Sequence, residues 1–282
     1  MTVRLGFLLL AAGLNAAVAL VALWRRSVSR SGAVAGFLVG SAILCAGGFF
    51  IWGMLMLFFV SASVISRVGA TTKTKLASMH EKGGERDAVQ VLANGGAGLV
   101  GSILIAVTGE PAFAAAAAGG FAAANADTWA SELGVLSPAP PHSIVTRREL
   151  APGASGGVTR TGTLASVGGS ALIAVWFALW VWAQQAAGSA AGLSRAALLL
   201  LIITAAGAAG SLIDSLLGAT IQALYRTEEG SLTERPTGDG GKNALVRGFR
   251  VVTNDVVNFV SSIAGAAIAG ALTAGVAGLT FG

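Results

Sequence analysis

The sequence predicts an all-α fold, a polytopic bundle of transmembrane helices, because the chain is too apolar and too poorly charged for a soluble protein. Hydrophobic residues make up 54% of the 282 residues and charged residues only 11%, whereas soluble proteins carry about 25% charged residues. The mean hydropathy is +0.76. A soluble protein must cover its surface with polar groups, but a lipid-facing surface needs no such cover. We therefore expect residues 1–282 to form a single transmembrane domain.

Apolar segments of about 20 residues set the expected number of membrane spans. We place eight of them, at residues 3–24, 32–46, 48–66, 88–108, 111–133, 162–184, 196–224 and 252–279. Only Gly47 and Gly48 separate the second segment from the third, so a re-entrant hairpin is the alternative for this pair. The alanine-rich fifth segment is the least hydrophobic, and Pro111 opens it at a position where a helix tolerates proline.

The basic residues sort onto alternate connections between these segments. Of the 18 lysines and arginines, all but Arg4 and Arg195 follow the first, third, fifth or seventh segment. Positively charged connections stay in the cytoplasm, so this side is predicted to be cytoplasmic and both termini to lie outside. The long cytoplasmic loops span residues 67–87, 134–161 and 225–251. In a prokaryote the membrane would be the cell inner membrane, with the site on its cytoplasmic side.

Several classes of function are disfavoured by composition. Cys45 is the single cysteine, so no disulfide framework or Cys-based metal site is possible. The two histidines, His80 and His142, lie in different loops, which argues against zinc. The net charge of +5 reflects the loop asymmetry of a membrane protein, and we expect no nucleic-acid partner.

Ionisable side chains within spans are costly and suggest function. Asp127 and Asp214 lie in apolar segments without a basic neighbour, and Glu132 lies about 140° round the helix from Asp127. Other polar residues lie toward the inner ends of their helices, and these are Asn94, Asn254, Asp255 and Asn258. The convergence of these side chains at one depth predicts a polar cavity open to the cytoplasm. As alternatives, Asn94 and Asn258 could join helices by hydrogen bonds, and Asp255 could stabilise a helix N-terminus.

Carboxylates without histidine or cysteine suit a hard, oxygen-ligated cation, and Mg²⁺ is usually held by one or two carboxylates plus substrate phosphates. We expect Asp127, Glu132 and Asp214 to be the metal ligands. The loops supply candidate phosphate-binding groups, which are Lys82, Arg86, Arg147, Arg148 and the residues Gly153, Ser155, Gly156, Gly157 and Thr159 before a helix, and Asn94 in the fourth span is a further candidate binding residue. This glycine-rich stretch is not a Walker A motif, and a flexible loop is the alternative. The loop cations could also serve only topology or lipid headgroups.

Three stretches of the chain together resemble a known family. They are NADTWASELG at residues 125–134, TRRELAPGASGGVTRTGTLAS at 146–166 and GSLIDSLLGATIQ at 210–222. Residues 87–95 and 253–259 fit the same pattern. The chain is thereby similar to the integral-membrane family that includes transmembrane protein 19 and plant phytyl-phosphate kinase. The resemblance implies an isoprenoid-phosphate kinase or a close relative of one.

The expected function is therefore transfer of a phosphoryl group from a nucleoside triphosphate, CTP or ATP, to an isoprenyl monophosphate in the membrane. Asp127, Glu132 and Asp214 would bind Mg²⁺, while Lys82 and Arg86 would offset developing charge. Asn254, Asp255 and Asn258 would complete the nucleotide-binding wall. Nucleotidyl transfer to the lipid phosphate would use the same groups, and an ion-coupled transporter or flippase is a further alternative. The prenyl chain length and the oligomeric state stay open.

Overall fold

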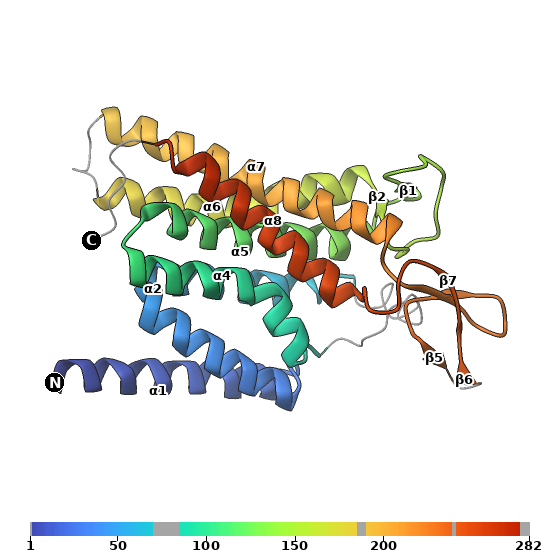
Figure 1. The fold of residues 1–282 in the computed structure, drawn as a ribbon, viewed down its shortest axis with the longest axis horizontal. Helices are drawn as coiled ribbons and strands as arrows, with labels where there is room; N and C mark the ends of the chain where they lie inside the picture. The colour runs from blue at the N-terminus through green and yellow to red at the C-terminus, as the bar shows by residue number, and fades with distance from the viewer. Residues whose placement is uncertain (1, 70–84, 185–189, 239–240, 277–282) are drawn as a thin grey trace.

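The computed structural model describes residues 2–69, 85–184, 190–238 and 241–276, which fold as a bundle of long helices (Figure 1). These are α1 (Thr2–Trp24), α2 (Arg30–Ile65), α4 (Ala88–Thr108), α5 (Pro111–Gly134), α6 (Arg160–Gln184), α7 (Ala190–Thr220) and α8 (Asn254–Thr273). The predicted helix-bundle class is confirmed, and each predicted apolar segment overlaps one of these helices. Within the described ranges, every helix except α5 is long and apolar enough to cross a membrane.

Helix α2 is bent back on itself at Gly48, where the backbone is non-helical with a φ of 65°. Glycine adopts such a positive φ without steric penalty. Both ends of α2 meet Arg86: the N–H of Ser29 donates to the Arg86 carbonyl (3.0 Å), and the Arg86 guanidinium donates to Ser63 Oγ (3.2 Å). The two halves therefore run in opposite directions, and the predicted break at Gly47–Gly48 is confirmed. The count of eight spans stays a prediction.

Helix α5 lies at the centre of the bundle and packs against α2, α4, α6, α7 and α8. Its alanines and glycines let the neighbouring backbones come close, as is usual in membrane bundles. A side chain at Gly119 would lie 2.4 Å from the carbonyl oxygen of Gly265 in α8, and one at Gly207 of α7 would lie 2.7 Å from Ala122 Cβ. The least hydrophobic predicted span is thus the most enclosed helix, since close packing favours small side chains over large apolar ones.

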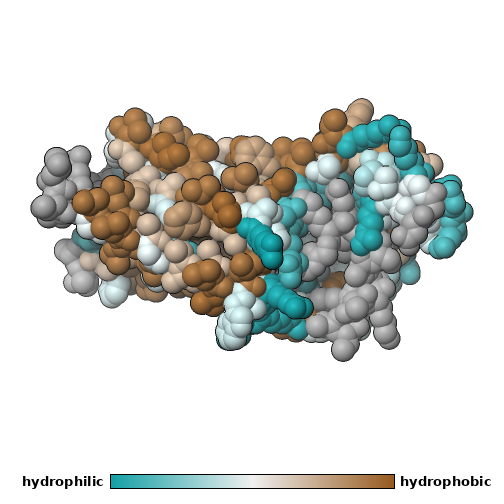
Figure 2. All heavy atoms as spheres, turned by 90° about the horizontal axis from the view of Figure 1, so that it is seen from below, coloured by the Kyte–Doolittle hydropathy of each residue, from teal (hydrophilic) through white to brown (hydrophobic). Residues whose placement is uncertain are grey.

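The surface divides into an apolar body and one polar end. Figure 2 shows hydrophobic side chains over the helices and hydrophilic side chains gathered where the loops lie. The start of α1 and the end of α8 lie at the opposite end of the bundle (Figure 1). The first residues of α1 and the last residues of α8 therefore lie away from the loops. That this end of the bundle faces the outside of the cell stays a prediction.

The loops contain short strands that the sequence did not predict. After α5, β1 (His142–Ser143) pairs antiparallel with β2 (Gly157–Val158). After α7, β3 (Leu224–Arg226) lies between β4 (Leu232–Thr233) and β7 (Ala244–Arg247), while β5 (Thr237–Gly238) pairs with β6 (Gly241–Lys242). The residue pairs are too few to give an alternating apolar pattern, so their sequences read as loop. These strands lie at the loop end of the bundle, beyond the ends of the helices (Figure 1).

Candidate functional site

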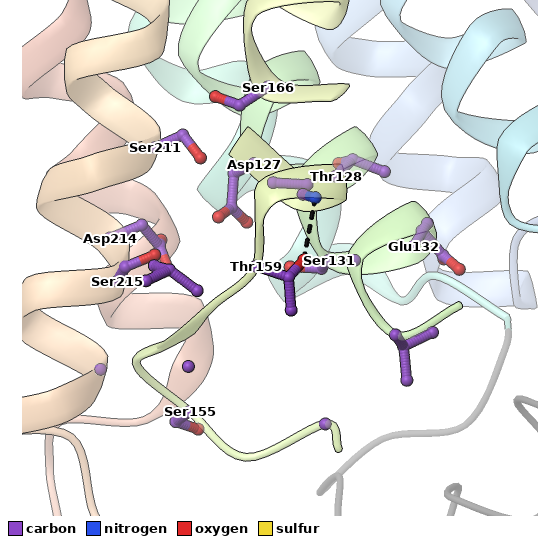
Figure 3. A pocket seen from close by; sticks show the side chains of 18 of the residues that line it. Asp127, Thr128, Ser131, Glu132, Ser155, Thr159, Ser166, Ser211, Asp214 and Ser215 are labelled. Carbon is purple, nitrogen blue, oxygen red and sulfur yellow. Dashed lines mark hydrogen bonds between the residues drawn. The ribbon is translucent and has the colours of Figure 1, made fainter. Parts of the chain in front are cut away.

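A cavity of about 950 Å³ lies at the loop end of the bundle. Its walls come from α2, α4, α5, α6, α7 and α8 and from the loops that follow α5 and α7. Most of the predicted site residues line it, namely Arg86, Asn94, Asp127, Glu132, Gly153, Ser155, Gly156, Gly157, Thr159, Asp214, Asn254, Asp255 and Asn258. The predicted convergence of polar groups from distant helices therefore occurs, and Figure 3 shows part of this wall.

Three predicted residues are not placed in this wall. Arg147 and Arg148 are exposed in the turn after β1, and neither lines the cavity. Arg147 adopts a positive φ of 61°, and its N–H donates to the carbonyl of Ser143 (2.9 Å). Their position in the sequence does not reveal that this pair of arginines lies outside the cavity wall. Lys82 lies outside the described residues.

The carboxyl groups of Asp127 in α5 and Asp214 in α7 lie close enough to interact directly. Figure 3 shows the two side chains directed toward the same space between the helices. The hydroxyl of Ser261 in α8 also donates to Asp214 Oδ2 (3.0 Å). Two carboxylates this close repel each other unless a proton or a cation is shared between them. The pair is thus a site where a positive charge is favoured.

Glu132 is not part of this carboxyl pair. Its Oε1 accepts a hydrogen bond from Ser66 Oγ (2.7 Å), and it interacts electrostatically with Arg86. In Figure 3, Glu132 lies well to one side of Asp127 and Asp214. The predicted three-carboxylate metal set is therefore not assembled. Five residues along a helix place Glu132 about 140° from Asp127, so one face cannot present both.

Arg86 provides a buried positive charge in the cavity wall next to α2. Its guanidinium donates to Ser63 Oγ (3.2 Å) and Ser66 Oγ (3.5 Å), which fixes its direction. Burial lowers the pKa of Arg86, and the nearby carboxylate of Glu132 raises it. An arginine stays protonated in proteins, so this buried cation is available to an anionic ligand.

The glycine-rich loop, residues 153–157, is held against α7. Gly156 has a φ of 79°, and a side chain there would lie 2.4 Å from Ala219 Cβ. Ser155 Oγ donates to Glu234, and Gln222 Nε2 donates to the same carboxylate (2.8 Å). Thr159 Oγ1 accepts from the N–H of Gly162 (2.9 Å) in the first turn of α6. These contacts give the loop a defined place in the cavity wall.

Glu234 is a cavity residue that the sequence did not single out. It lines the cavity, accepts hydrogen bonds from Ser155 and Gln222, and interacts electrostatically with Asp214 and Arg247. Burial lowers the pKa of Arg247, and Glu234 raises it. Glu234 lies in a charged loop with two nearby glutamates, Glu228 and Glu229, so only the hairpin fold distinguishes it.

The first turns of α4 and α8 complete the wall with amides. Asn94 Nδ2 donates to the carbonyl of Gln90 (2.9 Å), so part of its polar capacity is used within its own helix. Asn258 Oδ1 is buried and has no hydrogen-bond partner among the described residues. Asp255 is buried in the first turn of α8, where a negative charge is favourable. Of these residues, Asn258 thus offers the wall an acceptor that a bound ligand could satisfy.

The carboxyl pair fits a hard cation such as Mg²⁺ when a phosphate completes its coordination. Among the residues that the structure describes, no group of three or more His, Cys, Asp or Glu side chains forms a metal site. Ser211 and Ser215 share the cavity wall with the pair and add hydroxyl oxygens. Mg²⁺ is commonly held by one or two carboxylates together with substrate phosphates. The donors present match that pattern.

Comparison of the whole chain with known proteins finds relatives in a plant and an archaeon. A family described as "Integral membrane protein DUF92" matches residues 13–266. Protein PGR of Arabidopsis thaliana is 34% identical over 256 residues, covering 84% of this chain and 86% of that protein. Uncharacterized membrane protein MJ0933 of Methanocaldococcus jannaschii is 34% identical over 200 residues, covering 70% of this chain and 76% of that protein. No solved structure matches the chain. The chain belongs to the DUF92 family of integral membrane proteins.

Proposed function

We propose that the chain is a Mg²⁺-dependent phosphotransferase that moves a phosphoryl group from a nucleoside triphosphate to an isoprenyl monophosphate in the membrane. The observation that carries the proposal is the contact between Asp127 and Asp214 in the wall of a large polar cavity. A cation there would bind phosphate groups where lipid and water meet. The active site is proposed to face the cytoplasm.

The size and surroundings of the cavity suit two anionic substrates. Ligand pockets commonly enclose roughly 300–1,000 Å³, and about 950 Å³ is available here. The lining combines Arg86, Arg25 and Arg67 with the loop at residues 153–157. The helices outside the cavity present an apolar surface to lipid. A substrate with an anionic head and an apolar tail could therefore reach the cavity without leaving the bilayer.

The proposed reaction needs positioning and electrostatic stabilisation more than proton transfer. An oxygen of the lipid monophosphate attacks the γ-phosphorus, a new P–O–P linkage forms, and the bond to the β-phosphate oxygen breaks. The nucleoside diphosphate leaves. Asp127 and Asp214 would hold Mg²⁺, which when bound offsets the negative charge of the phosphate oxygens. Arg86 would orient the lipid phosphate, and the 153–157 loop would hold the nucleotide.

The resemblance to the family of plant phytyl-phosphate kinase supports the isoprenoid substrate class. The names of the plant and archaeal relatives specify no reaction, so the nucleotide and the prenyl chain length stay open. Either CTP or ATP could serve as the phosphoryl donor.

Nucleotidyl transfer is the second candidate, because the same cavity could align the lipid phosphate with the α-phosphorus. The products would then be a nucleoside diphosphate lipid and pyrophosphate. An ion-coupled transporter or flippase is the third candidate, since paired carboxylates within spans also occur in transporters. The position of the pair beside the loop end, together with the ordered 153–157 loop, favours transfer chemistry over transport.

The test is turnover by the purified protein in lipid nanodiscs. Geranylgeranyl phosphate or phytyl phosphate is offered with Mg²⁺ and each of ATP, CTP, GTP and UTP, and the products are identified by mass spectrometry. A prenyl diphosphate with a nucleoside diphosphate supports the kinase. A nucleotide-linked prenyl lipid with pyrophosphate supports nucleotidyl transfer and overturns the kinase. No product, with movement of the lipid phosphate between leaflets in vesicles, supports a flippase.

A further inference from the structure

A second, narrow cavity of about 80 Å³ lies between α1, α2 and α4. Its lining is almost entirely apolar and includes Val39, Phe58, Phe59 and Val91. Such a cavity inside a membrane bundle is a place for hydrocarbon, because polar groups that could hold water are scarce there. Its apolar lining contrasts with the polar lining of the large cavity.

The two cavities share one edge. Arg86, Gln90 and Asn94 line both of them. Gln90 and Asn94 lie one turn apart on α4, and Arg86 precedes that helix. The polar ends of these side chains thus separate an apolar space from a hydrophilic one. A molecule that occupies both spaces must carry an apolar chain and an anionic head, joined at the position of Arg86.

We propose that the α1–α2–α4 cavity binds the first isoprene unit of the lipid phosphate, with the phosphate held at Arg86 on the side of the large cavity. This inference rests on the proposed function for the identity of the lipid. An engineered apolar cavity of about 150 Å³ holds a benzene molecule, so about 80 Å³ accepts only the head-proximal part of a tail. The remainder of the tail would extend between the lipid-facing helices.

Gly36 is a position where a substitution can fill this cavity. It lines the cavity, and a side chain built at Gly36 would meet no atom within 4 Å. A leucine there can therefore project into the space without displacing a neighbouring backbone. Gly13 of α1 is the matched control, since it is also helical and unobstructed but does not line either cavity.

The experiment uses geranylgeranyl phosphate with a photoreactive diazirine in its first isoprene unit, bound to the full chain in nanodiscs without nucleotide. The cross-linked peptides are mapped by mass spectrometry in the wild type, Gly36→Leu, Gly36→Ala and Gly13→Leu. We expect labelling of peptides from α2 and α4 that contain Val39, Phe58 or Val91. Labelling should fall at least tenfold in Gly36→Leu and partly in Gly36→Ala, and it should be unchanged in Gly13→Leu. The alanine variant keeps the test valid if leucine prevents folding.

Competition separates this inference from the proposed function. Unlabelled geranylgeranyl phosphate should displace the probe, whereas phosphatidic acid, with the same phosphate and two acyl tails, should displace it at least tenfold less well. Equal displacement, or labelling spread over all lipid-facing helices, would overturn the isoprenoid site. Labelling confined to α2 and α4 without turnover would overturn the proposed kinase activity but support the tail-binding cavity. Turnover with labelling dispersed over the helices would support the kinase activity but overturn the tail-binding cavity.

Discussion

The carboxyl groups of Asp127 in α5 and Asp214 in α7 lie close enough to interact directly, although the two residues are 87 positions apart in the sequence. Each lies on a helix that packs against the other through alanine and glycine, so the backbones are close enough for two short side chains to meet. Ser261 of α8 donates to Asp214 and ties the third helix to the pair. Keeping two carboxylates together in an apolar bundle is unfavourable, because both are desolvated and they repel each other. A bound cation would offset this cost.

Replacing either acid by its amide should remove activity while leaving the fold intact. Asp127→Asn and Asp214→Asn should each lower kcat by about 10²-fold or more, because one anionic ligand is lost from the charge-stabilising centre. The apparent unfolding temperature should stay the same or rise, since repulsion between the two carboxylates disappears. Turnover of the prenyl phosphate and thermal unfolding in detergent are the two measurements.

Glu110 is the matched control for this pair, because it precedes the other end of α5 and is exposed. Glu110→Gln should retain wild-type kcat. If Asp127→Asn or Asp214→Asn keeps full activity, that residue has no part in the reaction.

Glu132→Gln should behave differently from the two aspartate variants. Glu132 accepts from Ser66 and interacts with Arg86, so the neutral amide would weaken a charged hydrogen bond worth about 1.5–3 kcal/mol and would remove the negative charge beside Arg86. We expect a lower unfolding temperature and a loss of less than about tenfold in kcat. A double-mutant cycle with Ser66→Ala should show non-additive stability changes. A kcat for Glu132→Gln as low as that of Asp127→Asn would place Glu132 among the catalytic residues after all.

Gly156→Ala should weaken nucleotide binding by distorting the 153–157 loop. The new methyl group would lie 2.4 Å from Ala219 Cβ, and the backbone would keep an unfavourable positive φ. We expect the KM for the nucleoside triphosphate to rise about tenfold. Gly230→Ala is the control, since its φ is also positive (86°) but nothing lies within 4 Å of a side chain there. Equal effects of the two variants would mean that the loop has no special relation to the nucleotide.

Glu234→Gln should loosen the same loop from the opposite side. The neutral amide would accept weaker hydrogen bonds from Ser155 and Gln222 than the carboxylate does. We expect kcat/KM for the nucleotide to fall about five- to tenfold, with a smaller change in the KM for the lipid phosphate. Kinetics with each substrate varied separately distinguish these effects. A change confined to the lipid KM would assign Glu234 to the other substrate.

The helical part of the fold could be predicted from the sequence because each element carries its own signal. Apolar length marks α1, α4, α6, α7 and α8, and the double glycine marks the bend of α2. Helix α5 shows the limit of this prediction. Its alanines make it the least hydrophobic segment, yet they allow it to pack most closely at the centre of the bundle. The short strands could not be predicted, since strands of two to four residues are set by tertiary contacts and leave no periodic pattern.

The site could be predicted only where single residues carry their own signal in the sequence. Asp127 and Asp214 stand out as acids within apolar segments, and their contact bears out the expected convergence. Glu132 and Asp127 are close in sequence, yet helix geometry turns Glu132 toward Ser66. Glu234 reaches the cavity only through the β3–β4 hairpin. Arg147 and Arg148 lie in an exposed turn outside the cavity wall, and their residue types do not reveal this.

Manganese binding tests the central claim most directly, because Mn²⁺ can replace Mg²⁺ at oxygen sites and is detected by electron paramagnetic resonance. The protein in nanodiscs is titrated with Mn²⁺ in the presence of a non-hydrolysable nucleoside triphosphate. One bound ion per chain, displaced by Mg²⁺ and lost in both Asp127→Asn and Asp214→Asn but kept in Glu132→Gln, is the expected result. Undiminished binding in the two aspartate variants would contradict a metal–phosphate centre at this carboxyl pair.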